Sequence, residues 1–149
     1  MKYEQRLKGI SILSVEAKKE KKRDPNNPCL FCTDPQGVSL DSEFAYSALD
    51  TYGVSPGHTL VIPKRHVASF FELMPEEVAD CMKLINEEKK NIDEQFSPDG
   101  YNIGVNIGPA AGQSIFHVHI HIIPRYKGDV ENPQGGVRHV IAKKAHYKR

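Results

Sequence analysis

The sequence predicts an α+β domain in which one long amphipathic helix packs on an antiparallel β-sheet. Strand-like segments follow one another directly, a single long stretch has helical periodicity, and no strand–helix–strand repeat is present. The length of 149 residues suits one domain. We expect this domain to span residues 24–149, after a charged N-terminal extension over residues 1–23, because the breaker run DPNNP at 24–28 separates the two.

The first two expected strands form a hairpin. Residues 43–49 are rich in strand-forming side chains and alternate loosely in polarity. Residues 58–62 (HTLVI) form the second strand, which Pro63 stops. The turn sequence SPG at 55–57 lies between them, so the two strands are close enough to pair in antiparallel fashion.

A long helix is expected over residues 75–96. Pro75 suits the first helical position, and the two glutamates that follow suit the positive end of the helix dipole. Apolar residues recur at spacings of three, four and seven, which places on one helix face Val78, Met82, Ile85, Ile92 and Phe96. Cys81 falls inside this pattern as a core residue, and the sequence SPDG at 97–100 ends the helix.

Two further strands follow the helix. Residues 101–107 alternate in polarity, and a loop of small residues at 108–112 comes next. Residues 114–123 form the clearest strand of the chain, and Pro124 closes it. Alternation puts on one face Ile115, His117, His119 and His121, and on the other face Phe116, Val118, Ile120 and Ile122. The stretch beyond Pro124 has no regular pattern.

Composition and charge exclude several classes of function. The net charge of +1 gives no general attraction for nucleic acid or for an acidic membrane surface, and we expect neither partner. No apolar run is long enough to span a bilayer, and no export signal is evident, so we expect a cytoplasmic protein. Basic clusters at 18–23 and 143–149 are expected to be solvated, with attraction of a polyphosphate as the alternative.

Three alternating histidines carry the strongest chemical signal. His117, His119 and His121 could share a polar sheet face by chance, bind one metal, or divide the steps of phosphoryl chemistry. The loop before them favours phosphoryl chemistry, because its small residues let a ligand approach backbone amides. We expect phosphate or a leaving group to be bound by Asn106, Gly112, Gln113 and Ser114.

Cys29 and Cys32 form a C-x-x-C pair in a chain without a disulfide pattern. A redox role is disfavoured because no strand–helix–strand unit surrounds the pair. We therefore interpret it as half of a metal site, since two thiolates and two further ligands complete a zinc tetrahedron.

Two segments resemble the histidine triad (HIT) family of nucleotide hydrolases and transferases. Residues 112–125 (GQSIFHVHIHIIPR) are similar to the family signature, and residues 55–66 (SPGHTLVIPKRH) to its upstream segment. The likeness extends over about residues 29–125 with the motifs in the expected order. It implies a nucleotide substrate of the purine type and a homodimer formed through the helix and an adjoining strand.

The resemblance also implies roles for individual residues. His119, the middle histidine, matches the family's nucleophile, which attacks the α-phosphorus and forms a nucleotidyl-histidine that water hydrolyses. His121 matches the residue that holds phosphate oxygens and assists the leaving group, and His58 matches an orienting position. Asp50 matches the position that binds ribose hydroxyls, with an exposed strand-end aspartate as the alternative.

A structural zinc ion is a further implication of the resemblance. Many bacterial members complete the two cysteines with the histidine after the second strand and the first histidine of the triad. Here these are His66 and His117, which would join Cys29 and Cys32 in a closed shell. The alternative is a degenerate pocket without metal.

The tail departs from one branch of the family. Residues 128–139 lack the Trp-containing ending of the phosphoramidase branch and are more similar to prokaryotic members described as dinucleoside polyphosphate hydrolases. We therefore expect a hydrolase of a dinucleoside polyphosphate or of a nucleoside phosphoramidate. The alternatives are a nucleotidyltransferase or phosphorylase, a nucleotide-binding scaffold with slow turnover, and a metallohydrolase. His139 and His146 are expected on the surface, and so is Arg138, with a contact to phosphate as the alternative.

Overall fold

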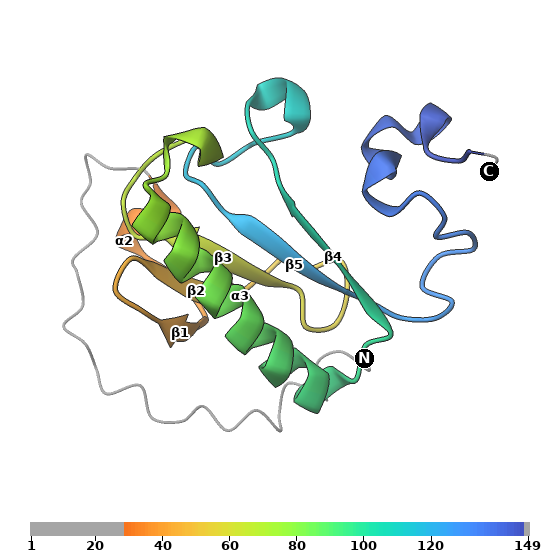
Figure 1. Cartoon of the computed structure of the whole chain (residues 1–149), viewed down its shortest axis with the longest axis horizontal. Coiled ribbons are helices and arrows are strands. Elements are labelled where there is room, and N and C mark those ends of the chain that lie inside the picture. The colour runs from red at the N-terminus through yellow and green to blue at the C-terminus, as the bar shows by residue number, and fades with distance from the viewer. Residues whose placement is uncertain (1–28, 148–149) are drawn as a thin grey trace.

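The computed structural model describes residues 29–147 of the chain. Within this range a five-stranded antiparallel sheet carries one long helix, α3, across one face (Figure 1). The strand order is β1-β2-β3-β5-β4. The strands are β1 (Val38–Asp41), β2 (Ala45–Leu49), β3 (Thr59–Pro63), β4 (Gly100–Val105) and β5 (Ile120–Arg125). The predicted extension over 1–23 and the domain start at residue 24 lie outside the described residues.

The predicted α+β class and the first hairpin are both confirmed. β2 and β3 pair in antiparallel register, with Ala45 opposite Pro63 and Leu49 opposite Thr59. Gly57 in the connecting turn has a φ of 84°, and a Cβ there would lie 3.0 Å from the ring of Phe96. Glycine at this position therefore lets the turn pack closely against the end of the helix.

Helix α3 spans Pro75–Phe96, the predicted bounds. At its start the carboxylate of Glu77 accepts a hydrogen bond from the backbone N–H of Met74 at 2.8 Å. At its end Ser97 adopts the left-handed conformation, with a φ of 50°, and its N–H bonds the carbonyl of Asp93. Both ends are set by side chains within a few residues, which is why the sequence located them.

The predicted strand over residues 114–123 is wrong at both ends. β5 begins only at Ile120, which is the first residue to pair with both neighbouring strands. Before it, the N–H of Val118 bonds the carbonyl of Val67 at 2.8 Å instead of a strand partner, and Phe116 is half exposed, not buried. β5 continues through Pro124, which lies opposite β4 beyond the end of the pairing with β3, so its missing N–H costs no ladder bond.

Two other strand predictions need correction. β1 was not expected, and β4 ends at Val105, two residues earlier than its polarity pattern indicates. β1 is a four-residue edge strand whose register against β2 shifts between its two ends. So short and irregular a segment has too few alternating residues to give a sequence signal.

The main core lies between α3 and the sheet. Its buried residues are Ala45, Val61, Cys81, Leu84, Ile85, Ile92, Ile120 and Ile122. Met82, predicted to face the core, is instead half exposed, because the buried helix face also includes two glutamates. Glu88 accepts a 2.5 Å hydrogen bond from the hydroxyl of Ser47 on β2, and Glu77 pairs with Arg65. Because the prediction considered only apolar residues, it placed the buried face of α3 too far toward Met82.

A second, smaller apolar cluster covers the opposite face of the sheet. Tyr46, Ala48, Leu60 and Ile62 form it, with Phe31 and Val38 packed against them. These side chains alternate along β2 and β3 with those that face α3. The sheet therefore carries apolar side chains on both faces, and the candidate site lies on the face away from the helix.

The C-terminal segment folds back as a series of 3₁₀ turns, Gly136–Lys144, beyond β4 (Figure 1). Arg138 is exposed as expected and braces this segment by donating hydrogen bonds to the carbonyls of Lys144 and Ala145. His139 and His146 are also exposed. Over the described range, 29–147, no helix combines the length and the apolar character that crossing a membrane requires.

Candidate functional site

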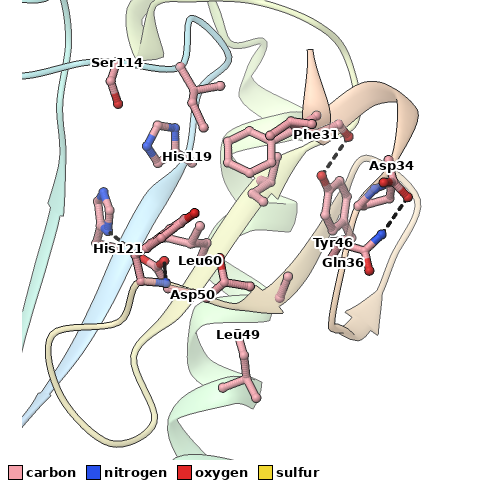
Figure 2. A pocket seen from close by; sticks show the side chains of 17 residues that line it. Phe31, Asp34, Gln36, Tyr46, Leu49, Asp50, Leu60, Ser114, His119 and His121 are labelled. Atoms are coloured by element: carbon pink, nitrogen blue, oxygen red, sulfur yellow. Dashed lines mark hydrogen bonds and ion pairs between the residues drawn. The ribbon is translucent and has the colours of Figure 1, made fainter. Parts of the chain in front are cut away.

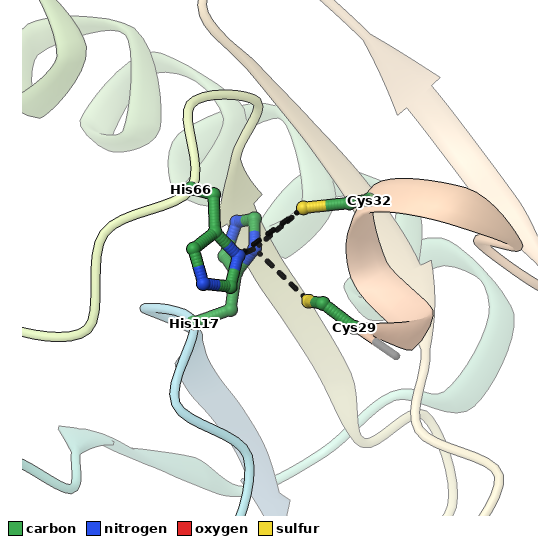
Figure 3. A group of neighbouring side chains, drawn as sticks. All are labelled: Cys29, Cys32, His66 and His117. Atoms are coloured by element: carbon green, nitrogen blue, oxygen red, sulfur yellow. Dashed lines mark hydrogen bonds between the residues drawn. The ribbon is translucent and has the colours of Figure 1, made fainter. Parts of the chain in front are cut away.

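Four metal-ligating side chains from distant parts of the chain converge (Figure 3). The ligand atoms of Cys29, Cys32, His66 and His117 all lie within 4.8 Å of one another. The Nδ1 atom of His117 is 3.4 Å from each sulfur and 3.1 Å from Nδ1 of His66. The sulfur of Cys32 is 3.2 Å from Nδ1 of His66.

These separations fit a tetrahedral zinc shell. With ordinary zinc–ligand lengths, two nitrogens lie roughly 3.3 Å apart, and a nitrogen and a sulfur roughly 3.5 Å apart. The ring nitrogen Nε2 of His117 donates a hydrogen bond to the carbonyl of Pro63 at 2.7 Å, since a carbonyl can only accept. The lone pair on its Nδ1 therefore faces the other three ligand atoms, as a metal ligand requires.

The local structure explains how these ligands are positioned. Cys29 is the N-cap of the one-turn helix α2 (Leu30–Thr33), and Cys32 lies within that helix. His66 follows β3, and its neighbour Arg65 holds this segment by a bidentate ion pair with Glu77, at 2.7 and 2.8 Å. Arg65 also donates to the carbonyl of Glu72. The pair ties the loop that carries His66 to the first turn of α3.

His119 lies next to this cluster and is almost fully buried. Its Nδ1 donates a 2.8 Å hydrogen bond to the carbonyl of His117, which fixes the proton on that nitrogen. The lone pair is then on Nε2. Because the side chain also lines a pocket, the ring has the tautomer and the setting that an imidazole nucleophile requires.

A second group of titratable side chains surrounds His121. The N–H of Val54 donates to Nδ1 of His58, so the proton of His58 lies on Nε2, which contacts Nδ1 of His121 at 2.9 Å and the Asp50 carboxylate at 3.4 Å. Nδ1 of His121 therefore accepts, and the proton of its neutral ring lies on Nε2. A hydrogen bond to the backbone thus sets the tautomer of His58, and through it that of His121, just as one sets the tautomer of His119.

Burial keeps the ring of His121 neutral near pH 7. Burial first, then the nearby rings of His119 and His58, lowers the pKa of His121 to about 4, while Asp50 acts in the opposite direction. Burial also lowers the pKa of His58, again against the pull of Asp50. The neutral ring of His121 can therefore donate a hydrogen bond from Nε2 to an incoming phosphate, and the neutral ring of His58 supports it at Nδ1.

The histidines open into a pocket of about 320 Å³ (Figure 2). His119, His121, Ser114 and Asp50 lie toward one end, and the opposite end contains Asp34 and Gln36. The apolar residues of its lining include Phe31, Tyr46, Leu60 and Ile62. A pocket that has polar groups at its ends and is apolar along its wall suits a nucleoside phosphate.

Asp50 is placed where a carboxylate can bind a diol. One carboxylate oxygen accepts the backbone N–H of Tyr52 at 2.9 Å, and the side chain is 15% exposed inside the pocket. The other oxygen faces His58 and, at 3.9 Å, Nδ1 of His121. Asp50 is therefore held by the backbone and by His58 while it remains accessible from the pocket.

Of the four residues predicted to bind phosphate, one lines the pocket and three do not. Ser114 lines the pocket, whereas Asn106, Gly112 and Gln113 are not among the lining residues. The amide of Gln113 is buried, accepts from the N–H of Gly108 and donates to the carbonyls of Ala68 and Ile115. Its side chain is therefore fully engaged within the protein and braces the loop.

Sequence reasoning missed the apolar wall of the pocket. Leu60 and Ile62 alternate with Val61 along β3, so a two-faced strand was visible in the sequence, but the pattern did not show which face would meet a ligand. Phe31 lies between the two cysteines and gave no signal by itself. Its ring reaches the site only because α2 folds against β2 and β3.

Comparison with known proteins gives a consistent family assignment. The model of the HIT domain matches residues 34–128. An uncharacterized HIT-like protein of Methanocaldococcus jannaschii is 40% identical over 110 residues, which are 69% of this chain and 83% of that protein. Adenylylsulfatase HINT3 of Arabidopsis thaliana is 39% identical over 108 residues, which are 69% of this chain and 55% of that protein.

Two further relatives extend the comparison. The AP-4-A phosphorylase of Mycobacterium tuberculosis is 33% identical over 119 residues, which are 72% of this chain and 61% of that protein. The crystal structure of a zinc-bound histidine triad family protein from Mycobacterium smegmatis is 34% identical with a TM-score of 0.64, and the match covers 70% of this chain and 80% of that one. Sequence and fold agree with the clustered histidines, and the chain belongs to the HIT domain family.

Proposed function

We propose that this protein hydrolyses a purine nucleotide derivative at its α-phosphorus, through a covalent nucleotidyl-histidine on His119. The observation that carries the proposal is the hydrogen bond from Nδ1 of His119 to the carbonyl of His117. This bond leaves the Nε2 lone pair for attack, in a pocket that also contains a carboxylate for the ribose. The substrate class is a dinucleoside polyphosphate, such as diadenosine tetraphosphate, or a nucleoside phosphoramidate.

The first step forms a bond between Nε2 of His119 and phosphorus and breaks the bond to the leaving group. A polyphosphate leaving group departs with the electron pair and needs no proton at neutral pH. The nitrogen of an amine leaving group takes up a proton from solvent and departs as the neutral amine. His121 donates a hydrogen bond from Nε2 to the phosphate oxygens, and His58 supports it from behind. Asp50 accepts the ribose hydroxyls, and the aromatic ring of Phe31 contributes apolar surface for the base.

The second step releases the nucleotide. Water attacks phosphorus, loses a proton to solvent, and the N–P bond returns its electron pair to His119. If inorganic phosphate replaces water, the same site acts as a phosphorylase, and the name of the mycobacterial relative favours this as the second candidate. Both candidates share the intermediate and differ only in the acceptor.

We propose that Cys29, Cys32, His66 and His117 bind a structural Zn²⁺ ion. The zinc-bound relative supports this proposal, as do the tetrahedral separations. When bound, the ion supplies a cross-link between α2, the loop after β3 and His117, two residues before the nucleophile. Four protein ligands leave no position for water, so the metal is not expected to act on the substrate.

A homodimer is also part of the proposal, formed through α3 and an adjoining strand as the family resemblance implies. Light scattering coupled to size exclusion tests it, with a mass twice that of the 16.7 kDa chain expected. A single-chain mass at working concentrations would contradict it.

The decisive experiment compares His119→Asn with the matched control His139→Asn, which alters an exposed histidine of the tail. Diadenosine polyphosphates, ADP and an AMP-amine are supplied to the wild type and both variants, with and without phosphate. We expect His119→Asn to lose turnover by at least about 10³-fold, the order that removal of a nucleophile costs, while AMP still binds. The control should retain full turnover.

Reactions quenched with denaturant at alkaline pH, where a P–N bond survives, then identify the intermediate by mass spectrometry of peptides that contain residue 119. A nucleotidyl adduct on His119 is expected in the wild type and not in the variant. Retained turnover in His119→Asn would rule out the covalent mechanism. A wild type that binds AMP and turns over no substrate would leave the scaffold function in its place.

A further inference from the structure

One short segment belongs to both the metal cluster and the nucleotide pocket. Cys29 and Cys32 contribute two of the four metal-ligating atoms. Between and just beyond them, five residues line the pocket: Leu30, Phe31, Asp34, Pro35 and Gln36. We call residues 29–36 the knuckle wall, because the turn that holds the cysteines is also one wall of the pocket (Figures 2 and 3).

The knuckle wall has little regular structure to stabilise it. Its helix, α2, contains only four residues, and a single helical turn is unstable in isolation. A hydrogen bond from the hydroxyl of Tyr46 to the carbonyl of Phe31, at 2.8 Å, connects it to the sheet. The side chain of Thr33 bonds only within the wall itself, to Cys29. A metal bound by both cysteines would therefore be a principal constraint on the wall.

Phe31 connects the wall to the catalytic residues. Its ring centroid lies 5.8 Å from that of His117, in an edge-on arrangement, and 5.2 Å from that of His119. His117 in turn holds His119 through its backbone carbonyl. The metal cluster is thus connected to the pocket in two ways. One is the ring of Phe31, and the other is the hydrogen bond between His119 and the carbonyl of His117.

We propose that zinc binding and nucleotide binding are energetically coupled, and that Phe31 is the positioning residue that transmits the coupling. Zinc fixes the knuckle wall, and the fixed ring of Phe31 then covers the nucleoside without a further loss of conformational freedom. The inference rests on the proposed zinc site and nucleotide pocket. Because coupling between two ligands is reciprocal, AMP must raise the affinity for zinc by the factor by which zinc raises the affinity for AMP.

The test measures both sides of this cycle on the full chain. Calorimetry gives the affinity for AMP of the zinc-loaded protein and of the protein stripped by a chelator, with circular dichroism as a check on folding. Competition with a chromophoric chelator gives the affinity for zinc with and without saturating AMP. The competition begins from the loaded, folded protein, so it remains informative if the stripped protein unfolds. We expect each affinity to change by about 5- to 50-fold, in the range of measured couplings.

Phe31→Ala removes the ring and keeps all four metal ligands. We expect this variant to bind zinc, yet to show no more than a twofold response of zinc affinity to AMP. Phe31→Leu, which retains apolar volume, should restore part of the response. The matched control Val140→Ala alters an apolar side chain that is 83% exposed in the tail, and it should respond like the wild type.

The outcomes distinguish a failure of the coupling from a failure of the proposed zinc site or nucleotide pocket. If zinc and AMP both bind and neither alters the affinity for the other beyond twofold, the coupling is refuted while the proposed function stands. If Phe31→Ala keeps the full response, Phe31 is not the link. A loaded protein that fails to bind AMP, or a chain that fails to bind zinc, overturns the underlying proposal and the inference with it.

Discussion

The buried ring of His121 makes a quantitative prediction about stability and pH. In the folded protein its pKa falls from 6.5 to about 4, through burial, then through His119 and His58, with Asp50 opposing. The side chain is 20% exposed, so solvent screens little of this effect. Since one pKa unit corresponds to about 1.4 kcal/mol, the lowering amounts to about 3 kcal/mol.

The direction follows from proton linkage. The unfolded chain binds a proton at this ring more tightly than the folded protein does. Above about pH 6.5 the ring is neutral in both states and does not affect the free energy of unfolding. As the pH falls from 6.5 toward 4, protonation of the unfolded chain progressively lowers that free energy. Replacing the ring by an uncharged amide, His121→Asn, should remove most of this pH dependence, about 2–3 kcal/mol between pH 7 and pH 4.

Urea denaturation followed by circular dichroism at half-unit pH steps measures the effect. Release of any bound metal in acid affects wild type and variant alike, so the difference between their pH slopes isolates the ring. His146→Asn is the matched control, since it alters an exposed histidine of the tail, and its slope should equal that of the wild type. Equal slopes for the wild type and His121→Asn, or a His121 ring that titrates above pH 6 by NMR, would refute the reasoning.

Two other predictions concern the supports of the site. Arg65→Met leaves the buried Glu77 carboxylate without its cation, so we expect a lower midpoint in urea denaturation together with weaker zinc retention through the displaced His66. An unchanged midpoint would contradict the anchoring role. Gln113→Ala removes three internal hydrogen bonds of the loop, and should reduce kcat/KM roughly tenfold while AMP binding falls less than threefold; unchanged turnover would show that the loop keeps its shape without the brace.

Local chemistry explains which elements the sequence located correctly. The bounds of α3 depend on Pro75, on the glutamates of the first turn and on the Ser-Pro pair that follows Phe96, all of which act within a few residues. The hairpin of β2 and β3 depends on a short turn between two apolar segments. The four candidate metal ligands came from spacing together with a family resemblance, and the structure brings the same four together.

Long-range contacts explain what the sequence did not locate. The polarity of residues 114–119 alternates as in a strand, but pairing with β3 and β4 begins only at Ile120, because the chain before it turns the His117 ring toward the cysteines. The buried face of α3 includes Glu88, whose partner Ser47 is 41 residues away. The spacing of apolar residues within the helix cannot reveal a hydrogen-bond partner this distant in the sequence, so the burial of Glu88 could not be predicted.

By itself, the sequence determined that three histidines alternate after a glycine-flanked loop and that two cysteines have the spacing of half a metal site. Only the tertiary structure decided how each histidine is used. His117 donates from Nε2 to Pro63, His119 donates from Nδ1 to the carbonyl of His117, and His121 accepts at Nδ1 from His58. A neutral imidazole carries one proton and one lone pair, so the partner of one ring nitrogen decides what the other nitrogen can do. Those partners are backbone and side-chain groups that only folding brings together.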